Sequence, residues 1–206
     1  MIREAMTIMG GRGRFPDNTM VVTNRRLAVP RALVEQLERV CALGPRMVVL
    51  REKDLDENEY ARLAAEAAEV CARWGVPLAV HSHEEVARAV GAAALHLTMD
   101  ALRVRASSAM GRESETLLIG ASVHSVAEAA EAQALGADYL IAGHIFATGC
   151  KPGIEPRGLA FLKEVCAAVD IDVFAIGGID LDPERIAAAL ACGAAGTCTM
   201  SAAMRL

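Results

Sequence analysis

The chain has 206 residues, of which 53% are hydrophobic and 3% aromatic, and its formal net charge is -5. This length favours one domain, and a core of Ala, Val, Leu and Ile is typical of buried parallel sheets covered by helices. The acidic balance, without a cluster of Lys and Arg, argues against binding to nucleic acid through a basic face.

The six cysteines are scattered and form no C-x-x-C pair, so the sequence predicts neither a zinc module nor a disulfide framework. This cysteine usage fits a reducing cytoplasm. No apolar run approaches the roughly 20 residues of a membrane span, and residues 1–18 lack the apolar core of a signal peptide. We therefore predict a cytoplasmic protein without a membrane partner, in which residues 1–18 form an extension before a domain over residues 19–206.

Short apolar runs alternate with helical segments along the chain. Strands are predicted where four or five apolar residues follow one another, and helices where apolar residues recur at helical spacing. Pro30 is placed in the first turn of its helix, Asp56 is a predicted N-cap, and Gly75 is predicted to end the helix that Asp56 begins. In chain order the predicted elements are strand Thr19–Thr23, helix Pro30–Leu43, strand Met47–Leu50, a helix from Asp56 to Trp74, strand Pro77–Val80, helix Glu84–Val90, strand Ala94–Leu97 with a weaker helix after it, strand Leu117–Ala121, helix Val126–Leu135, strand Tyr139–Ala142, strand Val173–Ile176, helix Pro183–Cys192 and strand Gly196–Met200.

Eight strands separated by helices predict a single α/β domain, a closed (β/α)8 TIM barrel with right-handed crossovers. The doubly wound alternative usually carries a glycine-rich turn after the first strand, where this chain has Thr23-Asn24-Arg25. Only Ser201–Leu206 follows the eighth strand, so the closing helix is short or missing. We expect the N-terminal extension or a partner chain to cover this flank, which keeps a homo-oligomer among the options.

In such a barrel the carboxyl ends of the strands face one cavity. Gly177 and Gly178 follow strand seven, and Met200 and Ser201 follow strand eight, where barrels of this kind bind phosphate. The simpler interpretation is that the two glycines only turn the chain.

Three further side chains that could take part in binding or catalysis lie at predicted strand ends. Arg51 and Lys53 point the same way on an extended strand and can bind an anion, unless they form rim salt bridges with Glu52 or Asp54. His124 follows strand five, and a histidine side chain is able to accept and return a proton near neutral pH.

The remaining polar residues at strand ends receive weaker assignments. His144 has apolar neighbours in sequence and is interpreted as packed and hydrogen-bonded. Cys150 stands beside Lys151, but without an adjacent base it is interpreted as lining of the cavity rather than as a nucleophile. His81 and His83 have the spacing of two metal ligands, yet no third ligand is evident, so no metal is predicted there.

The motifs at these positions resemble the thiamin phosphate synthase/TenI family from Val21 to Met204. The resemblance implies a TIM barrel, a phosphate site after strands seven and eight, and a role in assembling the thiazole half of thiamin. The motifs that carry it are Arg51-Glu52-Lys53, Gly136-Ala137-Asp138-Tyr139, Thr148-x-Cys150-Lys151, Ala175-Ile176-Gly177-Gly178-Ile179 and Gly193-Ala194-Ala195-Gly196.

In the synthase branch, the resemblance implies Mg²⁺ held by acidic residues after strands three and four. The Asn-Asp pair of that pattern is replaced here by His81-Ser82 or Ser82-His83, and its Gly-Gln-Glu-Asp by Thr98-Met99-Asp100-Ala101. Because Mg²⁺ prefers oxygen ligands and at most Asp100 remains, the sequence predicts no metal and no other cofactor.

Ser122-Val123-His124-Ser125, Gly-His-x-Phe and Thr-x-Cys-Lys all resemble TenI, the thiazole tautomerase. The resemblance predicts an isomerase that aromatises thiazole carboxylate phosphate by a proton shift at His124, without a metal. Arg51 or Lys151 would pair with the carboxylate. The predicted substrate-binding residues are Arg51, Lys53, Ser122, Thr148, Cys150 and Lys151, and the predicted phosphate-binding residues are Gly177, Gly178, Met200 and Ser201.

Two alternatives stay open. One is the synthase, a transferase that joins a pyrimidine pyrophosphate to thiazole phosphate. The other is a non-catalytic barrel that binds a thiamin precursor or regulates through a partner, because Val49 stands where the family often has a polar residue before Leu-Arg-Glu.

Overall fold

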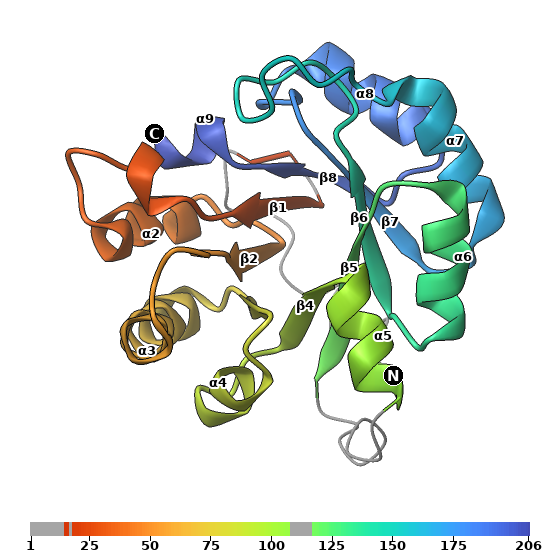
Figure 1. Ribbon diagram of the computed structural model, residues 1–206. Helices are drawn as coiled ribbons and strands as arrows, with labels where there is room; N and C mark the ends of the chain where they lie inside the picture. Colours follow the sequence, from red (N-terminus) through yellow and green to blue (C-terminus); the bar gives the residue numbers. More distant parts are fainter. Residues whose placement is uncertain (1–14, 17, 108–116) are drawn as a thin grey trace.

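The computed structural model describes residues 15–16, 18–107 and 117–206 (Figure 1). Its parallel strands pair in chain order from β1 to β8, and β8 pairs with β1, which closes the barrel. The predicted (β/α)8 fold is therefore confirmed. The strands are β1 Thr19–Val22, β2 Met47–Leu50, β3 Leu78–His81, β4 Ala94–Thr98, β5 Leu118–Val123, β6 Tyr139–Gly143, β7 Asp172–Ile176 and β8 Gly196–Thr199.

Helices surround the barrel on its outer side (Figure 1). They are η1 Arg25–Leu27, α2 Leu33–Ala42, α3 Glu57–Trp74, α4 Glu84–Ala89, α5 Met99–Ser107, α6 Val126–Ala134, α7 Gly158–Ala168, α8 Pro183–Ala191 and α9 Ser201–Met204. The helix α7 has no counterpart among the sequence predictions; its buried Leu162 and Val165 three positions apart were the available signal.

The boundaries of α3 follow from its end residues. The Asp56 carboxylate accepts a hydrogen bond from the backbone N–H of Glu59, and the Glu59 carboxylate accepts one from the N–H of Asp56. Gly75 ends the helix with φ 67°, a left-handed conformation that glycine adopts without strain. Both predicted end residues of this helix are confirmed.

The predicted start of the first helix at Pro30 is wrong. Asn24 accepts a hydrogen bond from the N–H of Arg26 and caps a short 3-10 helix instead. The N–H of Arg31 then donates to the carbonyl of Ala28, which places Pro30 in a turn. The helix α2 begins only after this turn, at Leu33.

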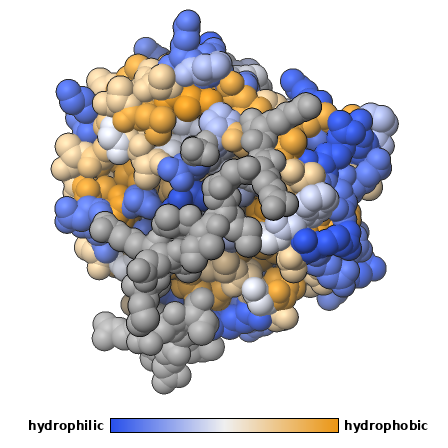
Figure 2. Space-filling view, turned by 180° about the vertical axis from the view of Figure 1, so that it is seen from behind, coloured by the Kyte–Doolittle hydropathy of each residue, from blue (hydrophilic) through white to orange (hydrophobic). Residues whose placement is uncertain are grey.

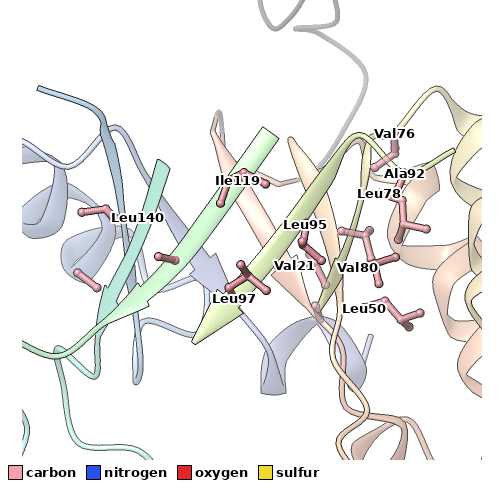
Figure 3. Close-up of a cluster of buried hydrophobic side chains, with 14 of the residues drawn as sticks. Val21, Leu50, Val76, Leu78, Val80, Ala92, Leu95, Leu97, Ile119 and Leu140 are labelled. Atoms are coloured by element: carbon pink, nitrogen blue, oxygen red, sulfur yellow. The ribbon is translucent and has the colours of Figure 1, made fainter. Parts of the chain in front are cut away.

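Side chains alternate between two cores along each strand. The outward-facing side chains meet the helices; Figure 3 shows Val21, Leu50, Val80, Leu95 and Leu140 among them. The inward-facing set fills the barrel with Met20, Val22, Met47, Val49, Ala79, Ala94, Tyr139, Ile141, Phe174 and Cys198.

The short closing helix α9 is hydrogen-bonded to α2, near the beginning of the barrel domain. The Gln36 side chain donates from Nε2 to the carbonyl of Ala203 at 2.7 Å, and Ala203 and Met204 are buried. Helix α9 also contacts η1, and Figure 1 shows α9 on the same side of the barrel as α2. The expectation that residues 1–18 or a partner chain cover this flank falls mainly outside the described residues and stays a prediction.

The surface is mixed in character. Figure 2 shows hydrophilic and apolar residues interspersed over one face, with hydrophilic residues most numerous along one side. None of the helices in the described part of the chain is both long and apolar enough to cross a membrane.

Candidate active site

A pocket opens where β6, β7 and β8 end. It brings together eight of the residues predicted from the sequence, whereas Arg51, Lys53 and Ser122 are not part of its lining. The eight are His124, Thr148, Cys150, Lys151, Gly177, Gly178, Met200 and Ser201. The position agrees with the carboxyl-end rule for barrels of this kind.

Gly177 and Gly178 carry one wall of this pocket. Both have positive φ values, 101° and 66°. A Cβ on Gly177 would lie 2.3 Å from the Cβ of His144, and one on Gly178 would lie 2.4 Å from the carbonyl oxygen of Ala147. The loop after β6 therefore packs directly on this turn, and both glycines are needed for the backbone whether or not they bind phosphate.

His124 is held in one orientation at the pocket. Its Nδ1 lies 2.8 Å from the carbonyl oxygen of Gly143, and its backbone N–H donates to the Glu128 carboxylate at 2.6 Å. A carbonyl oxygen can only accept, so in the neutral imidazole Nδ1 carries the hydrogen. Nε2 is left with a lone pair that can accept a hydrogen bond or a proton.

The loop after β6 supplies Thr148, Cys150 and Lys151. The Thr148 hydroxyl accepts from the N–H of Cys150, and the Thr148 carbonyl accepts from the N–H of Lys151. The Cys150 sulfur lies 3.5 Å from the Ser201 hydroxyl, so this loop reaches the residues that follow β8. Cys150 is exposed, which agrees with its interpretation as cavity lining.

Two buried polar atoms next to the pocket have no hydrogen-bond partner within the described residues, His144 Nδ1 and Thr199 Oγ1. His144 is packed, as its sequence neighbours indicate, and its Nε2 lies 3.2 Å from the carbonyl of Ile154. Thr199 lines the pocket together with Met200 and Ser201, which directly follow it in the sequence.

The acidic neighbours of Arg51 and Lys53 are engaged elsewhere. The buried Glu52 carboxylate accepts hydrogen bonds from the Thr23 hydroxyl at 2.7 Å and from the N–H of Arg25. Asp54 pairs with Arg25 and Arg26, whose hydrogen bonds lower the pKa of that carboxyl to about 2. The rim salt bridges considered for Arg51 and Lys53 therefore do not form with these two acids.

The charges of Arg51 and Lys53 influence the pKa values of neighbouring groups at the mouth of the barrel, where the carboxyl ends of the strands lie. Partial burial, and then the charges of Arg51 and Lys151, lower the pKa of Lys53. Burial, followed by the charges of Arg51 and Lys53, lowers the pKa of His81 to about 4. Lys53 thus lies within electrostatic range of two other cations, Arg51 and Lys151, an arrangement that an anionic ligand would stabilise.

The ends of β3 and β4 do not fit a magnesium site. The His81 side chain is buried with Nδ1 2.8 Å from the Ser82 hydroxyl, and the His83 ring packs on that of Tyr60 with centroids 4.2 Å apart. Asp100 is 93% exposed and pairs with Arg103 at 2.9 Å. No group of three or more His, Cys, Asp or Glu side chains with metal-binding geometry occurs in the described ranges.

Comparisons with known proteins agree over nearly the whole barrel. A family model described as thiamine monophosphate synthase, TMP-TENI, matches residues 19–203. A thiamine-phosphate synthase from Clostridium novyi is 34% identical over 187 residues, which cover 90% of this chain and 89% of that protein. Thiamine-phosphate synthase 2 from Streptococcus pneumoniae is 37% identical over 177 residues, 85% of this chain and 82% of its own.

A solved structure gives the same result. The thiamine phosphate pyrophosphorylase from Pyrococcus furiosus superposes with a TM-score of 0.75 at 29% sequence identity, and the match covers 92% of this chain and 88% of that one.

These findings overturn the prediction of a thiazole tautomerase. The relatives are named as synthases, and the matched structure as a pyrophosphorylase, so the isomerase assignment is wrong. That assignment depended on His124, His144 and Cys150, which lie in or beside loops that pack on a barrel common to the family. Loop residues of this kind vary on one fold without by themselves fixing the reaction.

Proposed function

Because the chain belongs to the TMP-TENI family of thiamine monophosphate synthases, we propose that it acts as a thiamine-phosphate synthase. Such a transferase joins a pyrimidine pyrophosphate to a thiazole phosphate and releases pyrophosphate. The observation that carries the proposal is the similarity to proteins of that name, which extends over 90% of the chain.

The geometry of the pocket suits one of the two substrates. A phosphate fits the corner between Gly177-Gly178 and Met200-Ser201, where the hydroxyls of Thr199 and Ser201 are available as donors. Burial of Thr199 Oγ1 without a described partner is costly, and a phosphate oxygen would supply an acceptor. We assign the thiazole phosphate to this corner.

The cationic mouth suits the other substrate. Departure of pyrophosphate builds negative charge on the leaving group, and fixed cations stabilise that charge in the transition state. Lys53 lies within electrostatic range of Arg51 and of Lys151, and the three cations are assigned this task. The residues after β3 and β4 do not fit Mg²⁺, so the charge of the leaving group falls to these three cations.

His124 is assigned a positioning role at the border of the two subsites. Its Nδ1–H is engaged by Gly143, so Nε2 offers an acceptor to a donor group of the substrate. The lining groups Thr148 and Cys150 complete the phosphate side.

The direct test supplies purified protein with the pyrimidine pyrophosphate and thiazole phosphate, with and without added Mg²⁺. Stoichiometric formation of thiamin phosphate and pyrophosphate is the expected result. Failure to release pyrophosphate under either condition, while both substrates bind in calorimetry, would overturn the transferase assignment.

That outcome would favour the second candidate, a barrel that binds thiamin precursors without turnover. The misfit of the residues after β3 and β4 to Mg²⁺ is the observation on its side. Binding of thiazole phosphate with no product over prolonged incubation would select it.

Replacing Asp100 by alanine is expected to change kcat/KM for thiamin phosphate formation less than about twofold. Its carboxylate is exposed and paired with Arg103, and exposed pairs of this type contribute little. Steady-state assays over a range of Mg²⁺ concentrations measure this. A loss of tenfold or more that excess Mg²⁺ restores would show that Asp100 is a metal ligand after all.

Lys53 is expected to limit the alkaline side of the pH profile. A lysine binds an anion only below its own pKa, and partial burial together with Arg51 and Lys151 lowers the pKa of Lys53 below its usual value of 10.5. The KM for the pyrimidine pyrophosphate should therefore rise as pH increases through this lowered pKa.

The Lys53→Arg variant provides the comparison, because a guanidinium stays charged throughout this range. Its KM should change less with pH than that of the wild type. Parallel pH profiles for the two proteins would contradict the assignment.

A further inference from the structure

Three polar side chains from neighbouring strands form a hydrogen-bonded line inside the barrel. Tyr139 on β6 has its hydroxyl 3.3 Å from Nδ1 of His96 on β4, and Nε2 of His96 lies 2.8 Å from the Ser122 hydroxyl on β5. Tyr139 and His96 are only 4% and 2% exposed, whereas Ser122 is half-buried. The line thus runs from the interior towards the mouth.

The position of Gly120 leaves room for this line. A Cβ there would lie 2.1 Å from Tyr139 Cζ and 2.6 Å from His96 Nδ1. On its other side the Tyr139 ring meets the Phe174 ring edge-on, with centroids 6.2 Å apart. The two rings of the line are therefore confined in one arrangement.

The arrangement determines which ring nitrogen of His96 carries the hydrogen. Burial above all, with the charges of His81 and Arg51, lowers the pKa of His96 to about 3, so the imidazole is neutral at physiological pH. Burial also raises the pKa of Tyr139, which keeps its hydroxyl protonated. Within the described residues, His96 Nδ1 is the recorded partner of that hydroxyl.

A buried hydroxyl hydrogen needs an acceptor. If His96 Nδ1 accepts from Tyr139, then Nε2 carries the hydrogen and donates it to Ser122. In the opposite tautomer Nδ1–H would point at the Tyr139 oxygen, and the tyrosine hydrogen would be left without an acceptor. The first arrangement satisfies all three groups.

We propose that Tyr139 and His96 are positioning residues that make Ser122 a hydrogen-bond donor to the substrate. Since the Ser122 oxygen accepts from His96, its own hydrogen is free to be donated at the mouth. Ser122 lies near the end of β5, two positions before His124, so both side chains point towards the inside of the barrel, and of the two His124 lines the pocket described above. The partner is an acceptor atom on the ligand, such as an unprotonated ring nitrogen.

The identity of the ligand as a thiamin precursor rests on the proposed function. The direction of the hydrogen bond between His96 and Ser122 does not. The first test therefore needs no ligand: nitrogen-15 NMR of the full chain at pH 7 distinguishes the tautomers of His96. A neutral Nε2–H tautomer is expected. A dominant Nδ1–H tautomer or a cationic ring would overturn the proposal.

The second test separates positioning from packing with Tyr139→Phe. This variant should admit the Nδ1–H tautomer and weaken binding of thiamin phosphate, used as the probe in calorimetry, by about three- to tenfold. In a Ser122→Ala background the Tyr139→Phe change should weaken binding of thiamin phosphate less than about twofold, because the hydrogen-bond donor is already absent. Equal losses of binding affinity in the wild-type and Ser122→Ala backgrounds would contradict the proposed role of the line.

Tyr60→Phe is the matched control. Tyr60 is also buried, and its hydroxyl donates to the Leu50 carbonyl at 2.7 Å, outside the line. It should lose stability without altering the His96 tautomer. If neither the wild-type protein nor any variant binds thiamin phosphate, the proposed function fails. The NMR result alone then decides whether His96 donates its hydrogen to Ser122.

Discussion

Replacing Gly120 by alanine is expected to lower the free energy of unfolding by about 3 kcal/mol, the upper range for overpacking a core. The new methyl group would fall 2.1 Å from Tyr139 Cζ and 2.6 Å from His96 Nδ1. Both neighbours are buried rings, so neither can move aside without disturbing the barrel interior. Chemical denaturation followed by circular dichroism measures the change.

Gly149→Ala is the matched control for this substitution. No atom lies within 4 Å of the position that its Cβ would take. We expect its unfolding free energy to stay within about 0.5 kcal/mol of the wild type. Similar stabilities for the two variants would show that the interior near β5 can rearrange.

Exchanging Lys151 for methionine is expected to reduce kcat/KM for thiamin phosphate formation about 100-fold, the scale found when one group that stabilises transition-state charge is removed. Lys151 lines the pocket and acts on Lys53 electrostatically. Arg51→Met should have an effect of the same order. The loss should fall mainly on kcat, because charge grows on the leaving group as the bond breaks.

Arg26→Met removes a cation from the same rim without touching the pocket. Arg26 is 75% exposed and pairs with Asp54, so its loss should change kcat/KM less than about twofold. If Arg26→Met and Lys151→Met had equal effects, general attraction by positive charge would explain both, and the assigned role of Lys151 would be wrong.

Much of the fold could be predicted from local patterns. Asp56 begins α3 and Gly75 ends it. Both ends could be predicted because a capping carboxylate and a left-handed glycine act on backbone groups only a few residues away. Pro30 misled the prediction, because proline suits a turn as well as a first helical turn, and here it lies in a local turn in which the N–H of Arg31 donates to the carbonyl of Ala28.

The site was predictable in part for a similar reason. Strand ends of a barrel converge, so His124, Lys151 and Gly177 could be placed near one cavity from their positions alone. The line from Tyr139 through His96 to Ser122 could not, because it depends on strand register and on the absence of a side chain at Gly120. The reaction itself required comparison with relatives.

The engagement of Glu52 by Thr23 and Arg25 has a consequence for substrate capture. With that carboxylate turned away, Arg51 and Lys53 form a local positive field on a protein whose formal net charge is -5. At physiological ionic strength such fields extend only about 8 Å. An anionic ligand is therefore attracted only when it comes within this distance of Arg51 and Lys53, which directs productive encounters to one end of the barrel.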